Sequence, residues 1–130
     1  MRYLLDTNVV IGLSKGLPGL ERRIRQTALT DVGLSVVVLH ELYFGAYKGQ
    51  RVAANLDAIA DLNFNIVDFD KEDARNAGMI RASLAAIGRP IGPYDVLLAG
   101  QAVARDLTLV SHNIREFSRI QGLRLEDWAV

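Results

Sequence analysis

Three acidic side chains stand where apolar segments of the chain begin or end. Asp6 follows the apolar run Tyr3–Leu5, Glu41 lies inside an otherwise apolar segment, and Asp95 precedes an apolar stretch after two prolines. Carboxylates gathered in one pocket repel one another, and a divalent cation relieves that repulsion. Because hard oxygen ligands suit Mg²⁺ or Mn²⁺, these three acids are candidate metal ligands.

A fourth polar group follows the apolar segment Leu107–Val110. Ser111, His112 and Asn113 come directly after it, and Glu116 lies three residues beyond Asn113. That spacing puts Asn113 and Glu116 on one face of a helical turn. We expect the two to share a fourth role at the site, with Glu116 reaching the ion through a bound water, and His112 to be a weaker candidate for a phosphate contact.

Each of these residues also has a purely structural explanation. Asp6, Asp95 and Asn113 are residue types that favour the N-cap of a helix, where the side chain satisfies a free backbone N–H. A single Glu such as Glu41 on an apolar helix more often points to solvent. Taken one at a time, the residues leave both explanations open, and only their convergence on one place favours a metal site.

Composition excludes several classes of protein. The 130 residues carry 15 basic and 15 acidic side chains, so net charge gives no sign of a strongly basic nucleic-acid binder. There is no cysteine, and two histidines do not form a zinc set. The chain lacks a glycine-rich phosphate loop, and Asn8 stands where haloacid-dehalogenase-like phosphatases have a second Asp. No apolar run approaches a membrane span and no secretion signal is evident, so we expect a cytoplasmic protein.

The elements that must position these residues alternate between strands and helices, which predicts an α/β fold with a mainly parallel central sheet flanked by helices. In such sheets ligands lie beyond the carboxyl ends of the strands. The predicted strands are 2–5, 32–34, 65–69, 107–110 and 123–125. The predicted helices are 8–15, 20–29, 36–48, 51–64, 71–88 and 96–105, with a helical turn at 113–117.

Four segments together resemble one known family. LLDTNVVI, LSVVVLHELYFGA, RPIGPYDVLLAGQA and LVSHNIREFSRIQGLRLEDW are similar to the motifs of PIN-domain ribonucleases, specifically bacterial VapC-type toxins, in the family's order. The resemblance covers essentially the whole chain and implies a single PIN domain over residues 1–130. Each motif alone is weak, but four in order at sensible spacing are a strong signal.

The resemblance assigns roles to individual residues. Asp6, Glu41 and Asp95 match the metal-binding acids of the family, Asn8 matches its polar helper residue, and Ser111 matches its hydroxyl. The chain departs from the family at the fourth acid, because many members have Asp where this chain has Asn113. The expected catalytic set is therefore Asp6, Glu41, Asp95 and Asn113.

The same resemblance implies a function. Family members are Mg²⁺- or Mn²⁺-dependent endoribonucleases, usually homodimeric, and are held inactive by a VapB-type antitoxin. We therefore expect a toxin that cuts structured RNA, either tRNA or rRNA, leaves 3′-hydroxyl and 5′-phosphate ends, and inhibits translation. Two alternatives stay open: a PIN-like regulator that acts with a DNA-binding antitoxin and cuts nothing, and a metal-dependent DNA nuclease.

Two further expectations concern surfaces. The first two predicted helices carry more apolar side chains than a core needs, so we expect Leu13 and Leu17 to help form a groove for an antitoxin segment. No aromatic platform for RNA bases stands out among the four phenylalanines, four tyrosines and single tryptophan.

Overall fold

The computed structural model describes residues 1–129 as a sheet of five short strands with seven α-helices and one 3-10 turn. The strands are β1 (Tyr3–Leu5), β2 (Val32–Ser35), β3 (Asn65–Val67), β4 (Thr108–Val110) and β5 (Arg124–Glu126). The helices are α1 (Thr7–Ser14), α2 (Pro18–Arg25), α3 (Val36–Lys48), α4 (Val52–Ala60), α5 (Lys71–Ala86), α6 (Pro93–Ala104) and α7 (Ile114–Phe117), and the 3-10 turn is Leu29–Asp31. No helix in this part of the chain is long and apolar enough to cross a membrane.

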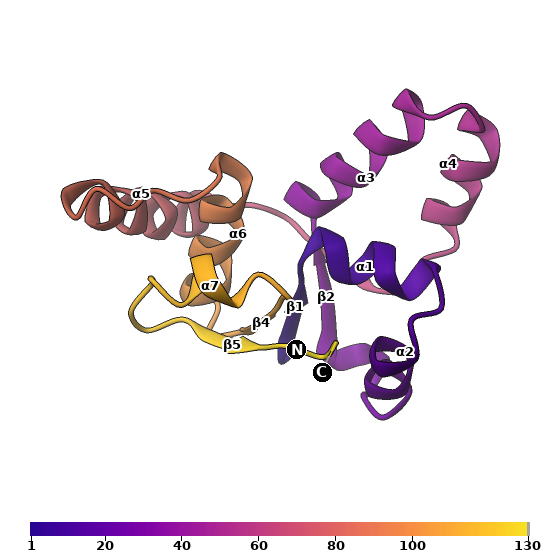
Figure 1. Ribbon diagram of the computed structural model, residues 1–130, viewed down its shortest axis with the longest axis horizontal. Helices are drawn as coiled ribbons and strands as arrows, with labels where there is room; N and C mark the ends of the chain where they lie inside the picture. The colour runs from indigo at the N-terminus through magenta and orange to yellow at the C-terminus, as the bar shows by residue number, and fades with distance from the viewer. Residues whose placement is uncertain (130) are drawn as a thin grey trace.

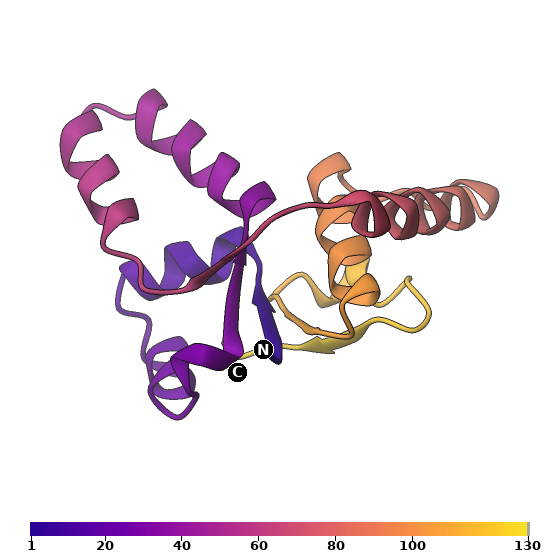
Figure 2. The ribbon, with the colours of Figure 1, turned by 180° about the vertical axis from the view of Figure 1, so that it is seen from behind.

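The predicted parallel sheet is confirmed. Its strand order is β3-β2-β1-β4-β5, and all four neighbouring pairs run parallel. Figures 1 and 2 show the strands between two groups of helices, with α1 to α4 on one side and α5 and α6 on the other. Because every strand runs in the same direction, all the strands end at one edge, and the polar residues that follow β1 and β4 meet there.

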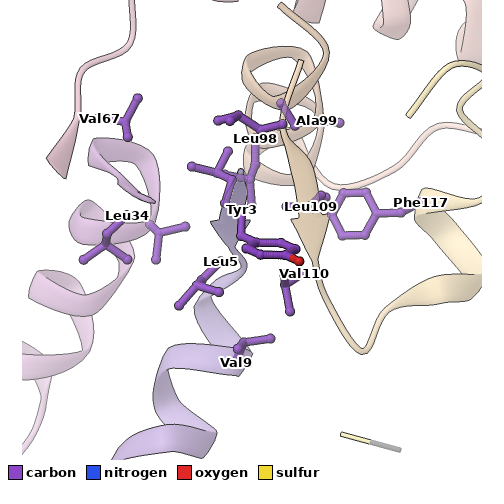
Figure 3. Close-up of a cluster of buried hydrophobic side chains, with 14 of the residues drawn as sticks. Tyr3, Leu5, Val9, Leu34, Val67, Leu98, Ala99, Leu109, Val110 and Phe117 are labelled. Carbon is purple, nitrogen blue, oxygen red and sulfur yellow. The ribbon is translucent and has the colours of Figure 1, made fainter. Parts of the chain in front are cut away.

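The hydrophobic core forms around the central strands, since helices cover both faces of the sheet. All three residues of β1 are buried, and Leu4 and Leu5 are fully so. Figure 3 shows Tyr3 and Leu5 from β1 beside Leu109 and Val110 from β4. This core contains none of the candidate metal ligands, so it does not need an ion to form.

Two of the differences from the predicted boundaries occur at prolines. Helix α6 begins at Pro93 rather than at Val96, and α2 begins at Pro18 rather than at Leu20. In both cases proline occupies the first helical position, where its fixed φ suits the helix and its missing N–H costs nothing. The earlier start of α6 moves Asp95 from the expected helix boundary into the first turn.

An ion pair holds the C-terminal end of α6, which lies away from Asp95, against α5. The Arg105 guanidinium, which follows α6, lies 2.9 Å from the Asp73 carboxylate in the first turn of α5. The Asp73 side chain is only 1% exposed. Burial alone would raise the pKa of Asp73, but hydrogen bonds from Arg105 and from the Asp70 backbone lower it below its usual value. The charged pair therefore fixes the position of the helix that carries Asp95.

Candidate active site

Asp6 lies at the centre of the site, at the carboxyl end of β1. Its backbone N–H donates to the Val110 carbonyl on β4 (2.9 Å), which fixes the residue to the sheet edge. One carboxylate oxygen accepts from the Thr7 N–H (2.8 Å) and the other from the buried Ser111 hydroxyl (2.8 Å). Asp6 is therefore both the N-cap of α1 and a side chain of the polar site. Burial raises the pKa of Asp6, and the two hydrogen bonds partly oppose that rise.

Glu41 reaches the same place from the second turn of α3. The Thr7 hydroxyl donates to its carboxylate at 2.9 Å, so Glu41 is tied to α1 across 34 residues of sequence. The side chain is only half-buried, but it faces the first turn of α1 instead of projecting freely into solvent. The hydrogen bond to Thr7 excludes the explanation in which Glu41 is simply a solvated residue on an apolar helix.

Asp95 is not a helix cap. Gly92 occupies the N-cap of α6, and no side chain caps this helix. A Cβ atom at Gly92 would lie 3.1 Å from a carboxylate oxygen of Asp95, so the glycine leaves room for that carboxylate. Burial, together with the negative charges of Asp6, Glu116 and Glu41, raises the pKa of Asp95 to about 6. Three other acidic groups are therefore close enough to oppose the ionisation of Asp95.

The residues after β4 complete the site. The Ser111 hydroxyl accepts from the Asn113 N–H (2.9 Å) while it donates to Asp6. Asn113 stands at the N-cap of α7 but makes no side-chain capping bond, and its amide nitrogen instead donates to the Glu116 carboxylate at 3.1 Å. The prediction that Asn113 and Glu116 share one face is confirmed.

The four acids carry negative charge without a cationic neighbour. None of Asp6, Glu41, Asp95 and Glu116 forms an ion pair with a basic side chain of residues 1–129, whereas several other acids of the chain do. Over the same residues, no group of three or more His, Cys, Asp or Glu side chains is arranged so that it could hold a metal ion as it stands. The donor set fits a hard divalent cation in kind, because it combines carboxylates with hydroxyl and amide oxygens. Binding would require the carboxylates to turn toward one another.

The sequence matches the PIN domain family over residues 3–123. The tRNA(fMet)-specific endonuclease VapC of Shigella flexneri is 40% identical over 131 residues, which is 99% of each chain. The chain belongs to the PIN-domain family and, within it, to the VapC proteins. PIN-domain nucleases generally depend on divalent metal ions, which agrees with the donor set of this site.

Solved structures agree with this assignment. The VapBC complex of Salmonella typhimurium, bound to DNA, contains a chain with a TM-score of 0.93, 35% identity and 98% coverage of both chains. VapBC-1 of nontypeable Haemophilus influenzae gives a TM-score of 0.91 at 31% identity, with both chains fully covered. The PIN-domain fold expected from the sequence motifs is therefore confirmed over nearly the whole chain.

Two further polar residues of the predicted site are exposed. Asn8, the expected helper, is exposed, while its neighbour Thr7 makes the hydrogen bond to Glu41. Thr7 is a site residue that was not predicted from the sequence, although its position directly after Asp6 in the first helical turn is a usable signal. His112 is exposed, and its Nδ1 lies 2.9 Å from Asp127. The proposed phosphate contact of His112 stays a prediction, as does the supporting role of Asn8.

The two leucines predicted to bind a partner differ from each other. Leu13 packs against the hydrophobic core, whereas Leu17 is 47% exposed. Much of the apolar surface attributed to the first two helices is core, because Val9, Val10 and Leu20 are buried. The VapC chain does have an apolar groove, but it lies between α1, α3 and α4, and neither Leu13 nor Leu17 lines it. Its volume is about 290 Å³, and its lining includes Ile11, Leu42, Ile59 and Glu41.

We predict that Ser111→Ala destabilises this PIN domain. The substitution leaves a carboxylate oxygen of buried Asp6 without its hydroxyl donor, which should cost about 1–3 kcal/mol of unfolding free energy. Loss of a bond that lowers the pKa of Asp6 should raise that pKa further, so the cost should be larger at pH 8 than at pH 4. Urea unfolding at both pH values measures this loss of unfolding free energy, and Ser118→Ala, at an exposed serine, is the control. An equal loss at both pH values would show that Ser111 acts by packing alone.

Proposed function

We propose that this chain is the ribonuclease toxin of a toxin–antitoxin pair and that it cuts structured RNA with the help of Mg²⁺ or Mn²⁺. The observation that carries the proposal is the group of four acids at one sheet edge. Burial and the charges of the other three raise the pKa of Asp95 to about 6, and none of the four forms an ion pair with a basic side chain within residues 1–129. Such a group has little structural value, since like charges destabilise a fold. The four acids are therefore better explained as a binding site for a divalent cation.

The residues divide into those that hold the ion and those that orient them. Asp6, Glu41 and Asp95 would bind the ion, and Glu116 would approach it through a water. When bound, the ion would lower the pKa of a water molecule and stabilise negative charge on the scissile phosphate. Ser111 and Thr7 donate to Asp6 and Glu41, so they direct the remaining oxygen lone pairs toward the site.

The proposed substrate is tRNA, because relatives of 40% and 38% identity are named tRNA(fMet)-specific endonucleases. The test is incubation of the purified protein with tRNA(fMet) and Mg²⁺, with mapping of new 5′ ends in vitro and in cells against an Asp6→Ala control. Cuts that require Asp6 would support the proposal. DNA of the same sequence tests the alternative of a DNA nuclease. Growth arrest without any cut in RNA or DNA would favour the non-cleaving regulator.

A titration of the metal tests the fourth position. Glu116→Gln removes a charge near Asp95, and we expect it to raise the Mg²⁺ concentration for half-maximal cleavage by about tenfold, the scale of effects from groups that support metal ligands. Asn113→Asp should lower that concentration, because it adds a charged oxygen where the chain has a neutral amide.

The control for this titration is Glu72→Gln, which removes an exposed carboxylate on α5 that is not among the acids acting on Asp95. Its Mg²⁺ dependence should match that of the unmodified protein. If neither Glu116→Gln nor Asn113→Asp changes the Mg²⁺ concentration for half-maximal cleavage, the fourth position has only a structural role and three acids bind the ion.

We also propose a VapB-type antitoxin as partner, since solved relatives are VapBC complexes, and a homodimer as the state of the free toxin. The apolar groove between α1, α3 and α4 would receive an antitoxin segment, because Glu41 lies in its lining and links the groove to the acidic site. Ile11→Asp, at a residue that lines this groove and is 37% exposed, should then weaken the complex with little loss of stability. Leu13→Asp should instead unfold the protein, because Leu13 packs against the core.

A further inference from the structure

Two aromatic rings stand at the rim of the acidic site. His40 directly precedes Glu41 on α3, and Tyr94 directly precedes Asp95 on α6. Their ring centroids are 5.1 Å apart and their planes are tilted by 58°. The pair therefore joins two elements that each carry an acid of the site. This contact between residues 54 positions apart is not evident in the sequence.

Neither ring is used by the core. Tyr94 is 46% exposed, and His40 is also exposed. The backbone on the Tyr94 side is restricted, because Pro90 and Pro93 lead into the first turn of α6. A large ring held in place and left open to solvent has lost conformational freedom without gaining burial. Such a ring is suited to receive a flat ligand.

We propose that Tyr94, supported by His40, stacks on a base of the RNA next to the scissile phosphodiester. This inference rests on the proposed ribonuclease function and adds a binding site for the substrate to it. RNA loops present unstacked bases, which proteins bind on aromatic side chains. A neutral base is not repelled by the four acids, whereas a phosphate is. The rim beside Asp95 and Glu41 is therefore better suited to hold a base than a second phosphate.

The comparison of Tyr94→Phe with Tyr94→Leu tests the proposal. Phe keeps the flat ring, whereas Leu keeps apolar bulk without it. The readout is single-turnover cleavage of tRNA(fMet), from which the enzyme concentration at half-maximal rate and the maximal rate are obtained. We expect Leu to raise the half-maximal concentration about tenfold or more, with little change in the maximal rate, and Phe to behave as the unmodified chain. Tyr47→Leu, at a more exposed tyrosine (64%) farther along α3, is the control and should change nothing.

A spectroscopic readout is independent of cutting. A hairpin with the mapped cleavage site carries 2-aminopurine on either side of the cut, in an Asp6→Asn background that should bind without cutting. Stacking on Tyr94 should alter its fluorescence, and Tyr94→Leu should abolish that change while Tyr94→Phe keeps it. His40→Ala should reduce the change, because it removes the ring that supports Tyr94.

Three results would overturn the inference, and each is distinct. Unchanged half-maximal concentration and fluorescence in Tyr94→Leu would show that no base stacks there. An equal loss in Tyr47→Leu would indicate a general aromatic effect. If Tyr94→Leu alters only self-association or antitoxin binding, the pair belongs to a protein interface. Failure of the unmodified chain to bind or cut RNA would instead remove the proposed function, and this inference with it.

Discussion

Asp95→Asn should abolish RNA cleavage and, in the absence of metal, make the protein more stable at neutral pH. Cleavage should fall about 10³-fold or more, since loss of a ligand to the catalytic ion removes several kcal/mol of transition-state stabilisation. Stability should rise because the Asp95 carboxylate is partly buried among three other acids. The combination is diagnostic, since a residue kept for stability would show the opposite effect on unfolding.

The pH dependence of this gain follows from the sign of the shift. The pKa of Asp95 is about 6 in the folded protein and near 3.8 when unfolded, so ionisation opposes folding. The penalty is small at pH 4, grows as the pH rises from the unfolded to the folded pKa, and is complete above about pH 7. We expect Asp95→Asn to gain about 1 kcal/mol at pH 7.5, after allowance for partial exposure, which corresponds to about 3–5 °C in melting temperature. At pH 4 most of the gain should be lost.

The measurement is thermal unfolding in EDTA at pH 4 and pH 7.5. The matched control is Asp57→Asn, which changes an exposed Asp on α4 and should alter the melting temperature at neither pH. Added Mg²⁺ should reverse the order at pH 7.5, because only the unmodified site binds the ion well. Near-normal cleavage by Asp95→Asn would show that Asp95 is not a ligand of the catalytic ion.

Removal of divalent cations should stop cleavage completely while the fold survives. The hydrophobic core is built from residues of β1, β2, β4 and the covering helices and includes none of the acids, so chelation removes nothing that the core needs. Circular dichroism should be unchanged in excess EDTA, and cleavage of tRNA(fMet) should return on addition of Mg²⁺ or Mn²⁺. At an ion concentration 100 times its Kd, the protein should also be stabilised by about 2.7 kcal/mol.

The control for chelation is Asp6→Ala, whose melting temperature should respond less to the same ions. Cleavage that persists in excess chelator would remove the metal from the proposal and would leave the acid cluster to act by proton transfer. Unfolding in EDTA would contradict the separation of core and site described here.

The sequence alone was sufficient for the arrangement of helices and strands and for the principal acids. Alternation of short apolar strands with helices determines a parallel sheet, because parallel strands need a crossover between them. Residues that follow such strands must then share one edge, which is why Asp6 and Ser111 could be expected together. Glu41 and Asp95 were assigned from the resemblance to the PIN-domain motifs, because they lie on helices and strand order does not determine where helical side chains lie.

Only the tertiary structure decided which side chains touch. Thr7 rather than Asn8 contacts Glu41, since the rotation of α1 about its axis sets which neighbour faces α3. The contact of His40 with Tyr94, and the position of the apolar groove between α1, α3 and α4, likewise depend on how helices distant in sequence pack. Sequence periodicity determines which face of a helix is buried, but the partner of that face depends on contacts between distant segments, which local patterns do not encode.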